Sequence, residues 1–445
     1  MRRNSKRVLI AGGGAVILLI TFWLALSVVY AIPSSWMEKQ LVESKIIMEK
    51  ESPYPSMYAR QGEKGSYDNF TVYYMLNIAS QTGKNPFLDS LESRQYRVDG
   101  NPSEALGKAI AGEESNSSYS RYWHGYLVFL KPLLLFLNVV QIRLLAQVSF
   151  FVLLSLVVDR LARHRDVGVG AGVILTASYC LFGAAQAAET LPVFPSFTLS
   201  LAGCLWAIHL SRIGVRTRIG GVFTEWYILF CSFGVLGALT TYFDFLDNPV
   251  LTLGVPLALY LYLERYSFSM GRLLKVGAAA TVGWILGYSL LWLGKWLLAE
   301  AVAGIPALSM AIDRVLLRSG ISDPETPGAT GALKAIAANI SALGFMRYAH
   351  VLVGLCAFSG IGLFVVRMGP ESGSMRSIAV TCFGLLLVSL LPYIWYMAAS
   401  NHSIVHANLM AYRTQIVAFY SWAMAIYLTV GYTRYNLKNK RHRKE

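Results

Sequence analysis

The stretch VLIAGGGAVILLITFWLALSVVYA, residues 8–31, is the clearest indication of the structural class of this chain. It contains no charged residue, and at about 1.5 Å per helical residue it is long enough to cross a hydrocarbon core about 30 Å thick. Similar stretches recur along the 445 residues, of which 55% are hydrophobic and 14% are charged. Because about one quarter of the residues in soluble domains are charged, we predict an all-α polytopic membrane protein.

About ten stretches are apolar enough to be transmembrane helices, and short basic clusters separate them. The five cysteines all lie within these stretches, and their spacing matches neither a disulfide framework nor a zinc site. The predicted spans lie near residues 8–31, 141–159, 167–188, 197–211, 223–242, 249–263, 276–299, 349–366, 377–399 and 414–433.

The net charge of +14 is distributed in clusters at alternate span ends. This distribution follows the positive-inside rule and argues against a surface that binds nucleic acid. The short loops 189–196 and 244–248 contain no Lys or Arg, as expected of an outer face. We therefore predict a plasma-membrane protein with both termini in the cytoplasm. The basic clusters are Arg2, Arg3, Lys6 and Arg7; Arg160, Arg163 and Arg165; Arg212, Arg216 and Arg218; Arg265, Arg272 and Lys275; Arg367 and Arg376; and Lys438, Lys440, Arg441, Arg443 and Lys444.

The predicted spans divide the chain into six parts. The first span resembles a signal peptide, but its apolar run exceeds the usual 7–15 or so residues, so we expect an uncleaved anchor. The parts are a cytoplasmic start with the first span (1–31), a large outer loop with interfacial helices (32–140), spans two to seven (141–300), an outer loop with amphipathic helices (301–348), spans eight to ten (349–433) and a basic cytoplasmic tail (434–445).

The first outer loop is the place where we expect the chemistry, because connecting two helices needs only a few residues. Its polar part runs from Pro33 to Gly125 and contains Tyr67, Asp68 and Asn69 just before a helix-like stretch. Asp68 suits the N-cap of that helix. A carboxylate there could also remove a proton from an acceptor hydroxyl, and the sequence leaves both roles open.

The same loop ends in an aromatic segment with two further candidate residues, Arg121 and His124. The apolar segment that follows, Tyr126–Asn138, is expected to lie in the outer interface, because crossing the membrane here would place the next basic cluster outside. Simple interfacial anchoring would explain the aromatic residues. A cation beside an aromatic platform would also suit a sugar or a phosphate.

Three more groups of polar residues are expected on the outer side. Asp244 and Asp247 stand among apolar residues at the membrane edge, where they would either pair with Lys295 or Arg413 or act in catalysis. The next group, His402 and His406, is four residues apart and could share one helical face. A third metal ligand is missing there, so we predict hydrogen bonding and no metal site, although a divalent cation as cofactor stays open. The loop 301–348 would roof the outer surface with interfacial helices, and its cations would be ordinary solvated residues.

Together these features resemble the GT-C class of integral membrane glycosyltransferases. The features that carry the resemblance are the long first outer loop, the interfacial segment Tyr126–Asn138, and the outer histidines and arginine near residues 401–413. The resemblance implies transfer of a sugar from a polyprenyl-phosphate donor to a glycan or lipid-linked acceptor at the outer face of the membrane. It also implies site residues: Asp68 as the base, with Asp89 and Asp244 as rivals, and Tyr67, Asn69, Arg121, His124, Asp244, Lys295, His402, His406 and Arg413 in binding.

Two other functions fit the same features. One is a flippase that grips the phosphate of a lipid-linked saccharide without a covalent step, and the other is a non-catalytic subunit of an envelope-assembly complex. A proton-coupled transporter is disfavoured, because ionisable residues are scarce in the predicted spans.

Overall fold

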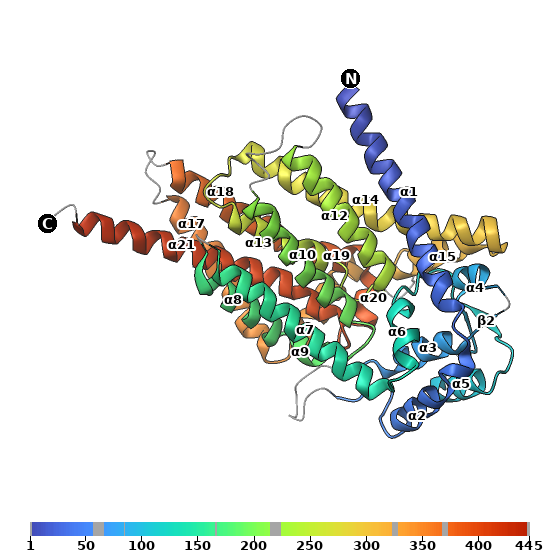
Figure 1. Ribbon diagram of the computed structural model, residues 1–445. Coiled ribbons are helices and arrows are strands. Elements are labelled where there is room, and N and C mark those ends of the chain that lie inside the picture. Colours follow the sequence, from blue (N-terminus) through green and yellow to red (C-terminus); the bar gives the residue numbers. More distant parts are fainter. Residues whose placement is uncertain are drawn as a thin grey trace.

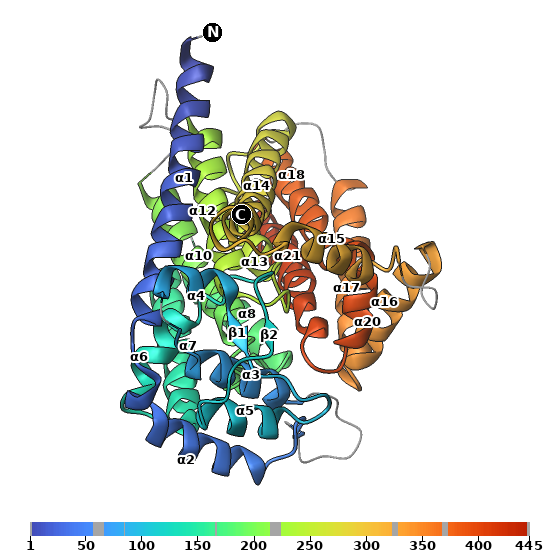
Figure 2. The same cartoon turned by 90° about the vertical axis from the view of Figure 1, so that its right-hand side faces the viewer.

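The computed structural model describes residues 2–56, 66–83, 85–164, 167–213, 224–322, 328–366 and 373–442. Long helices form one bundle, and α2 to α6 form a smaller domain at one end of it (Figures 1 and 2). We call this the outer domain and that end of the bundle the outer end, after the side of the membrane that the charge distribution predicts. The predicted basic residues Arg165, Arg216, Arg218, Arg367, Arg443 and Lys444 lie outside the described residues. The elements are α1 Arg2–Tyr30, η1 Ser34–Trp36, α2 Glu38–Glu49, α3 Asn69–Ser80, α4 Pro86–Glu92, β1 Arg94–Gln95, α5 Pro102–Ile110, β2 Ser117–Ser118, α6 Leu127–Leu134, α7 Val139–Ala162, α8 Gly168–Leu181, α9 Ala184–Ala187, α10 Phe194–Arg212, α12 Glu225–Phe243, α13 Leu251–Leu263, α14 Met270–Ala303, α15 Ala307–Arg318, α16 Gly328–Ala342, α17 Met346–Val366, α18 Gly373–Val388, α19 Leu391–Ala398, α20 Ser400–Val405, η2 Ala411–Gln415 and α21 Ile416–His442.

Within the described residues, eight helical segments are long and apolar enough to cross a membrane. The prediction of a helical, polytopic membrane protein is confirmed at this level. The segments are Asn4–Tyr30, Val139–Ala162, Phe194–Arg212, Glu225–Phe243, Met270–Ala303, Met346–Val366, Gly373–Ala398 and Ala411–Arg434.

The two other predicted spans, 167–188 and 249–263, fold as the shorter helices α8 and α13. The 13 residues of α13 rise only about 20 Å, less than the thickness of the hydrocarbon core. All of them are buried, and α13 packs against α10, α18 and α21. The apolar composition of this stretch therefore reflects burial inside the bundle.

The closest helix pair in the bundle is α12 against α14. Gly234 and Gly237 of α12 face Gly283 and Gly287 of α14, and a Cβ atom at Gly287 would collide with the backbone carbonyl of Gly234. Small residues of this kind let the backbones of membrane helices approach closely. The contact holds α12 beside α14, whose residues Tyr288, Trp292 and Trp296 line part of the candidate site described below.

The outer domain is fastened to the bundle by buried donors that bind backbone carbonyls. The Nζ atom of Lys295, on α14, donates to the carbonyl of Ser90 in α4 at 2.7 Å. The indole of Trp123 donates to Leu291 of α14 at 3.0 Å. Within the domain, β1 pairs antiparallel with β2, which joins the segment after α4 to the segment after α5. The site therefore lies between two parts that are held in a fixed relation.

Candidate functional site

A cavity of about 190 Å³ lies at the outer end of the bundle, beneath α15. We call this cavity, together with the α12–α13 turn and α20 beside it, the outer polar centre. Segments far apart in sequence contribute to its wall, from the outer domain to the loop after α19. The lining residues are Arg121, Tyr122, Leu246, Tyr288, Trp292, Trp296, Ala311, Arg314, Val315, Arg318, Ser319, Trp395, Ala398, Ala399 and His402.

Two buried carboxylates stand in the turn between α12 and α13. Both oxygens of Asp244, and Oδ2 of Asp247, are buried without a hydrogen bond of regular geometry. Between the two residues, Leu246 has a φ of 73°, and this left-handed conformation folds the turn back so that the Leu246 side chain lines the cavity. An unpaired buried carboxylate costs stability, so the turn is held there by the surrounding packing.

Burial raises the pKa of Asp244 to about 7, although the backbone N–H groups of residues 245–248 partly offset it. Burial and the charge of Asp244 raise the pKa of Asp247 well above its usual range. Asp247 also lies within electrostatic range of Arg318 and Asp68, and both carboxylates lie within range of Tyr288. Near neutral pH the pair therefore holds a proton that it can exchange.

The two predicted histidines meet at α20, with His402 in the helix, His406 directly after it and their ring centroids 4.5 Å apart. His402 binds the carbonyl of Leu246 through Nε2 at 2.9 Å, which leaves Nδ1 as an acceptor. His406 lies 3.4 Å from the guanidinium of Arg318 through Nε2. Burial lowers the pKa of His402 well below its usual range and that of His406 to about 4. Both rings are neutral at pH 7 and position the turn and Arg318.

One wall of the cavity is formed by Tyr288, Trp292 and Trp296 of α14. They belong to an aromatic row that begins deeper in the bundle at Trp284, with successive centroids 4.8, 5.3 and 5.6 Å apart. Trp296 donates its indole N–H to the backbone of Arg121 at 3.0 Å. The indole nitrogens of Trp292 and of Trp395, on the opposite wall, are buried without a hydrogen bond. The cavity thus combines flat apolar faces with donors turned away from solvent.

Three arginines supply positive charge around this cavity. Arg121 packs its guanidinium over the ring of Tyr119 at 4.1 Å, while Arg314 and Arg318 come from α15 above. The expectation that the cations of this loop are ordinary solvated residues is wrong for Arg318, which contacts His406. Arg413 is fully buried beside the same region, with its guanidinium 4.6 Å from the Tyr412 ring.

Asp68 lies near this centre but its carboxylate is already engaged. Its Oδ1 accepts from the backbone N–H of Thr71 at 2.9 Å, and its Oδ2 accepts from the Thr71 hydroxyl at 2.6 Å. The side chain caps α3, one of the two roles the sequence left open. Burial raises the pKa of Asp68, and burial near Glu189 raises that of Tyr67 to about 12.

Asn69 belongs to a brace between the outer domain and the membrane bundle. Its amide donates to Glu51 at 2.7 Å and accepts from Arg143 of α7 at 2.9 Å. Arg143 also pairs with Glu51 at 3.1 Å. Both ends of the Asn69 amide are therefore occupied by protein partners.

Three other candidates have structural partners. His124 donates through Nε2 to the carbonyl of Tyr119, 2.9 Å away, and burial lowers its pKa to about 3, so the ring is neutral at pH 7. Lys295 donates to the carbonyl of Ser90 at 2.7 Å, and among the described residues no ion pair joins it to Asp244. Asp89 accepts from the backbone N–H of Gly83 at 3.0 Å.

Sequence reasoning missed Arg314, Arg318 and the aromatic row, and it did not choose Asp247 as a site residue. The four-residue spacing of Trp284, Tyr288, Trp292 and Trp296 is the one signal that could have revealed the row. Among the described residues, no group of three or more His, Cys, Asp or Glu side chains is arranged to hold a metal ion.

Comparisons with known proteins identify no relative: no family model, curated protein or solved structure matches this chain significantly.

Proposed function

We propose that this protein is a glycosyltransferase of the outer membrane face that takes its sugar from a polyprenyl-phosphate donor. The acceptor is a glycan or another lipid-linked molecule, and the membrane is the plasma membrane with both termini cytoplasmic. The observation that carries the proposal is the pair of buried, unpaired carboxylates, Asp244 and Asp247, beside a cavity with arginines and aromatic faces.

In this proposal the carboxylate pair is the general base. It takes the proton of an acceptor hydroxyl, the acceptor oxygen bonds to the anomeric carbon, and the bond from that carbon to the phosphate oxygen breaks with its electron pair. A base near neutral pKa suits such a step, and Asp244 has a raised pKa of about 7. Asp68, the base expected from the sequence, is the weaker candidate because Thr71 occupies both its oxygens.

The departing polyprenyl phosphate gains negative charge, which the arginines around the cavity stabilise. Charge-assisted hydrogen bonds from guanidinium groups to phosphate are about twice as strong as neutral ones. Arg121, Arg314 and Arg318 are suitably sited, and the aromatic row offers its faces to the sugar ring. The donor's lipid chain stays in the bilayer, which accounts for a cavity at the membrane edge.

The test is sugar transfer by purified protein from a panel of polyprenyl-phosphate hexoses and pentoses, with donor binding followed in parallel. We expect wild type to use at least one donor, and Asp247→Asn and Asp244→Asn to lose about 100- to 10,000-fold in transfer while binding it. Asp99→Asn is the matched control, because Asp99 is an exposed carboxylate of the outer domain.

Three outcomes would count against the proposal or change it. Full activity in both α12–α13 turn variants, with loss only in Asp68→Asn, would return the base to Asp68. Binding and transbilayer movement of the donor without transfer would indicate a flippase. Neither binding nor transfer by wild type would leave the non-catalytic subunit as the better description.

A further inference from the structure

The cavity of the outer polar centre has two buried hydrogen-bond donors without an acceptor in its wall. They are the indole nitrogens of Trp292, on α14, and Trp395, on α19. A buried N–H group without an acceptor is unfavourable for folding, and native proteins contain few of them. The occurrence of two such donors in the wall of one cavity indicates a ligand that brings two acceptor oxygens.

The other tryptophans of the chain do not have this property. All ten lie within the described residues, and Trp36, Trp206 and Trp226 are exposed. The other five donate their indole N–H to a protein acceptor. These bonds are Trp23 to the carbonyl of Phe87 at 3.2 Å, Trp123 to the carbonyl of Leu291 at 3.0 Å, Trp284 to Oγ1 of Thr252 at 2.9 Å, Trp296 to the carbonyl of Arg121 at 3.0 Å and Trp422 to Oγ of Ser389 at 2.9 Å. The exceptions are therefore confined to the cavity.

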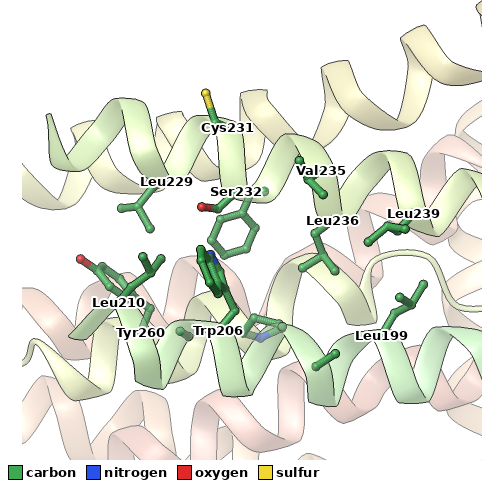
Figure 3. Close-up of a pocket in the computed structure, with 15 residues that line it drawn as sticks. Leu199, Trp206, Leu210, Leu229, Cys231, Ser232, Val235, Leu236, Leu239 and Tyr260 are labelled. Carbon is green, nitrogen blue, oxygen red and sulfur yellow. The ribbon is translucent and has the colours of Figure 1, made fainter. Parts of the chain in front are cut away.

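A second cavity, of about 430 Å³ between α10 and α12, provides a contrast. Its walls are almost entirely apolar, with Trp206 on α10 facing Leu229 and Leu236 on α12 (Figure 3). Among the described residues that line it, none has a buried polar atom without a hydrogen-bond partner. The unpaired indoles are thus a property of the outer polar centre and do not accompany every cavity of this bundle.

Flat aromatic faces accompany the two donors. The ring of Trp292 lies between Tyr288 and Trp296, with centroids 5.3 and 5.6 Å away, and the ring of Tyr122 meets it edge-on at 6.0 Å. All four side chains line the cavity. A sugar ring can pack its C–H groups against such faces while its hydroxyl oxygens accept hydrogen bonds. A phosphate group has no apolar face, so these walls favour the sugar as the ligand of the indoles.

We propose that Trp292 and Trp395 form a clamp for the donor sugar, in which each indole N–H donates to one hydroxyl oxygen of the ring. This inference rests on the proposed function and adds the residues that recognise the sugar, while the arginines of the cavity hold the phosphate. A sugar that lacks either hydroxyl is rejected, because it leaves a buried donor unpaired. No covalent step is involved in this recognition.

The experiment measures equilibrium binding of lipids to the purified full chain in detergent. The probes are polyprenyl-phosphate glucose, mannose, galactose and arabinose, and polyprenyl phosphate without a sugar. Wild type is expected to bind at least one glycosylated lipid about tenfold more tightly than the bare polyprenyl phosphate, the effect of two neutral hydrogen bonds.

Two conservative variants test the donors themselves. Trp292→Phe and Trp395→Phe each keep an aromatic face and remove one N–H group. Each should weaken binding of the preferred glycosylated lipid by about two- to tenfold and leave binding of the bare polyprenyl phosphate unchanged. The variants lie on different helices, so one remains informative if the melting temperature shows that the other folds poorly.

Trp206→Phe is the matched control, because it makes the same change in the other cavity and should bind both kinds of lipid as wild type does. Equal binding of the glycosylated lipid by wild type and both cavity variants would overturn the clamp. A wild type that binds bare polyprenyl phosphate as tightly as every glycosylated probe would also overturn it. Equal losses for both kinds of lipid in the variants would assign the indoles to the phosphate and reject the sugar clamp.

Transfer assays on the same preparations separate the clamp from the proposed function. Sugar-dependent binding that both variants weaken, without transfer by wild type, would keep the clamp and refute the transferase. Transfer by wild type, with sugar binding that neither variant alters, would keep the transferase and refute the clamp.

Discussion

Asp68 and Asp244 are both buried carboxylates on the same side of the bundle, yet their surroundings differ. Thr71 donates two hydrogen bonds to Asp68, one to each oxygen. Asp244 has neither oxygen in a regular hydrogen bond. Both have raised pKa values because of burial. Each oxygen of Asp68 therefore already accepts a strong local hydrogen bond, whereas Asp244 is approached only by backbone N–H groups of residues 245–248 that do not reach regular hydrogen-bond geometry.

Burial and position alone therefore do not identify a catalytic base. A carboxylate that caps a helix contributes to folding, and using it in catalysis would break the cap in each cycle. An unpaired carboxylate is unfavourable for folding, and functional sites are where such unfavourable groups are expected. Three of the four predictions below compare these two carboxylates, and the remaining one concerns Asn69, next to Asp68 in the sequence.

The largest expected effect is on the pH dependence of sugar transfer. If the α12–α13 pair is the base, the active form is ionised, so kcat/KM should fall about tenfold per pH unit below about pH 7. The measurement is the rate from pH 5 to pH 9 in wild type and in Asp68→Asn. The two profiles should coincide. A pH profile that is flat over this range, or that is shifted in Asp68→Asn, would contradict the assignment of the base to the α12–α13 turn.

The second prediction concerns the stability that the unpaired carboxylate removes. Asp244 has a pKa of about 7 in the folded protein and an ordinary value near 4 when unfolded. The folded state therefore holds the proton more tightly, and wild type loses stability as the pH rises from about 4 to about 7. The asparagine of Asp244→Asn does not titrate. The stability of this variant relative to wild type should therefore increase as the pH rises from about 4 to about 7.

The difference in unfolding free energy between Asp244→Asn and wild type should change by at most about 4 kcal/mol between pH 4 and pH 8. This difference can be followed by the apparent melting temperatures of the two proteins in detergent, measured at several pH values. Asp99→Asn, at an exposed carboxylate, should show no such trend. A constant difference at all pH values would mean that Asp244 is not perturbed.

How far the sequence predicted this molecule depends on whether the deciding contacts are local. Hydropathy located the eight long spans, because each one is a property of about twenty consecutive residues. It could not separate α13 from a span, since a helix buried among other helices is as apolar as one in lipid. The helix cap at Asp68 could also be predicted, since its partner, Thr71, is only three residues away.

Only part of the outer polar centre could be predicted from the sequence, for the same reason. Asp244 and Asp247 are two acidic residues in an apolar stretch, and this pattern is visible in the sequence. Their neighbours come from far along the chain: Arg318 from α15 and His402 from α20. No local pattern relates these segments to the α12–α13 turn, so the meeting of the carboxylates with the arginines required the folded structure.

The third prediction tests whether Asn69 binds substrate or braces the outer domain. Asn69→Ala removes a partner from both Glu51 and Arg143, which should lower the unfolding free energy by about 2 kcal/mol. Thermal unfolding and protease resistance of the outer domain would measure this loss, with Lys39→Ala, at an exposed position of α2, as the control. A raised KM with unchanged stability would instead make Asn69 a ligand of the substrate.

The smallest expected effect separates capping from catalysis at Asp68 itself. Asp68→Ala should cost about 1 kcal/mol of stability, the usual value for a lost N-cap, whereas Asp68→Asn should cost little because asparagine caps equally well. Both variants should keep most of their transfer activity if the α12–α13 turn supplies the base. Thermal unfolding and transfer assays on the same preparations give the answer: an Asp68→Asn protein as stable as wild type but inactive would mean that the cap and the base are one residue.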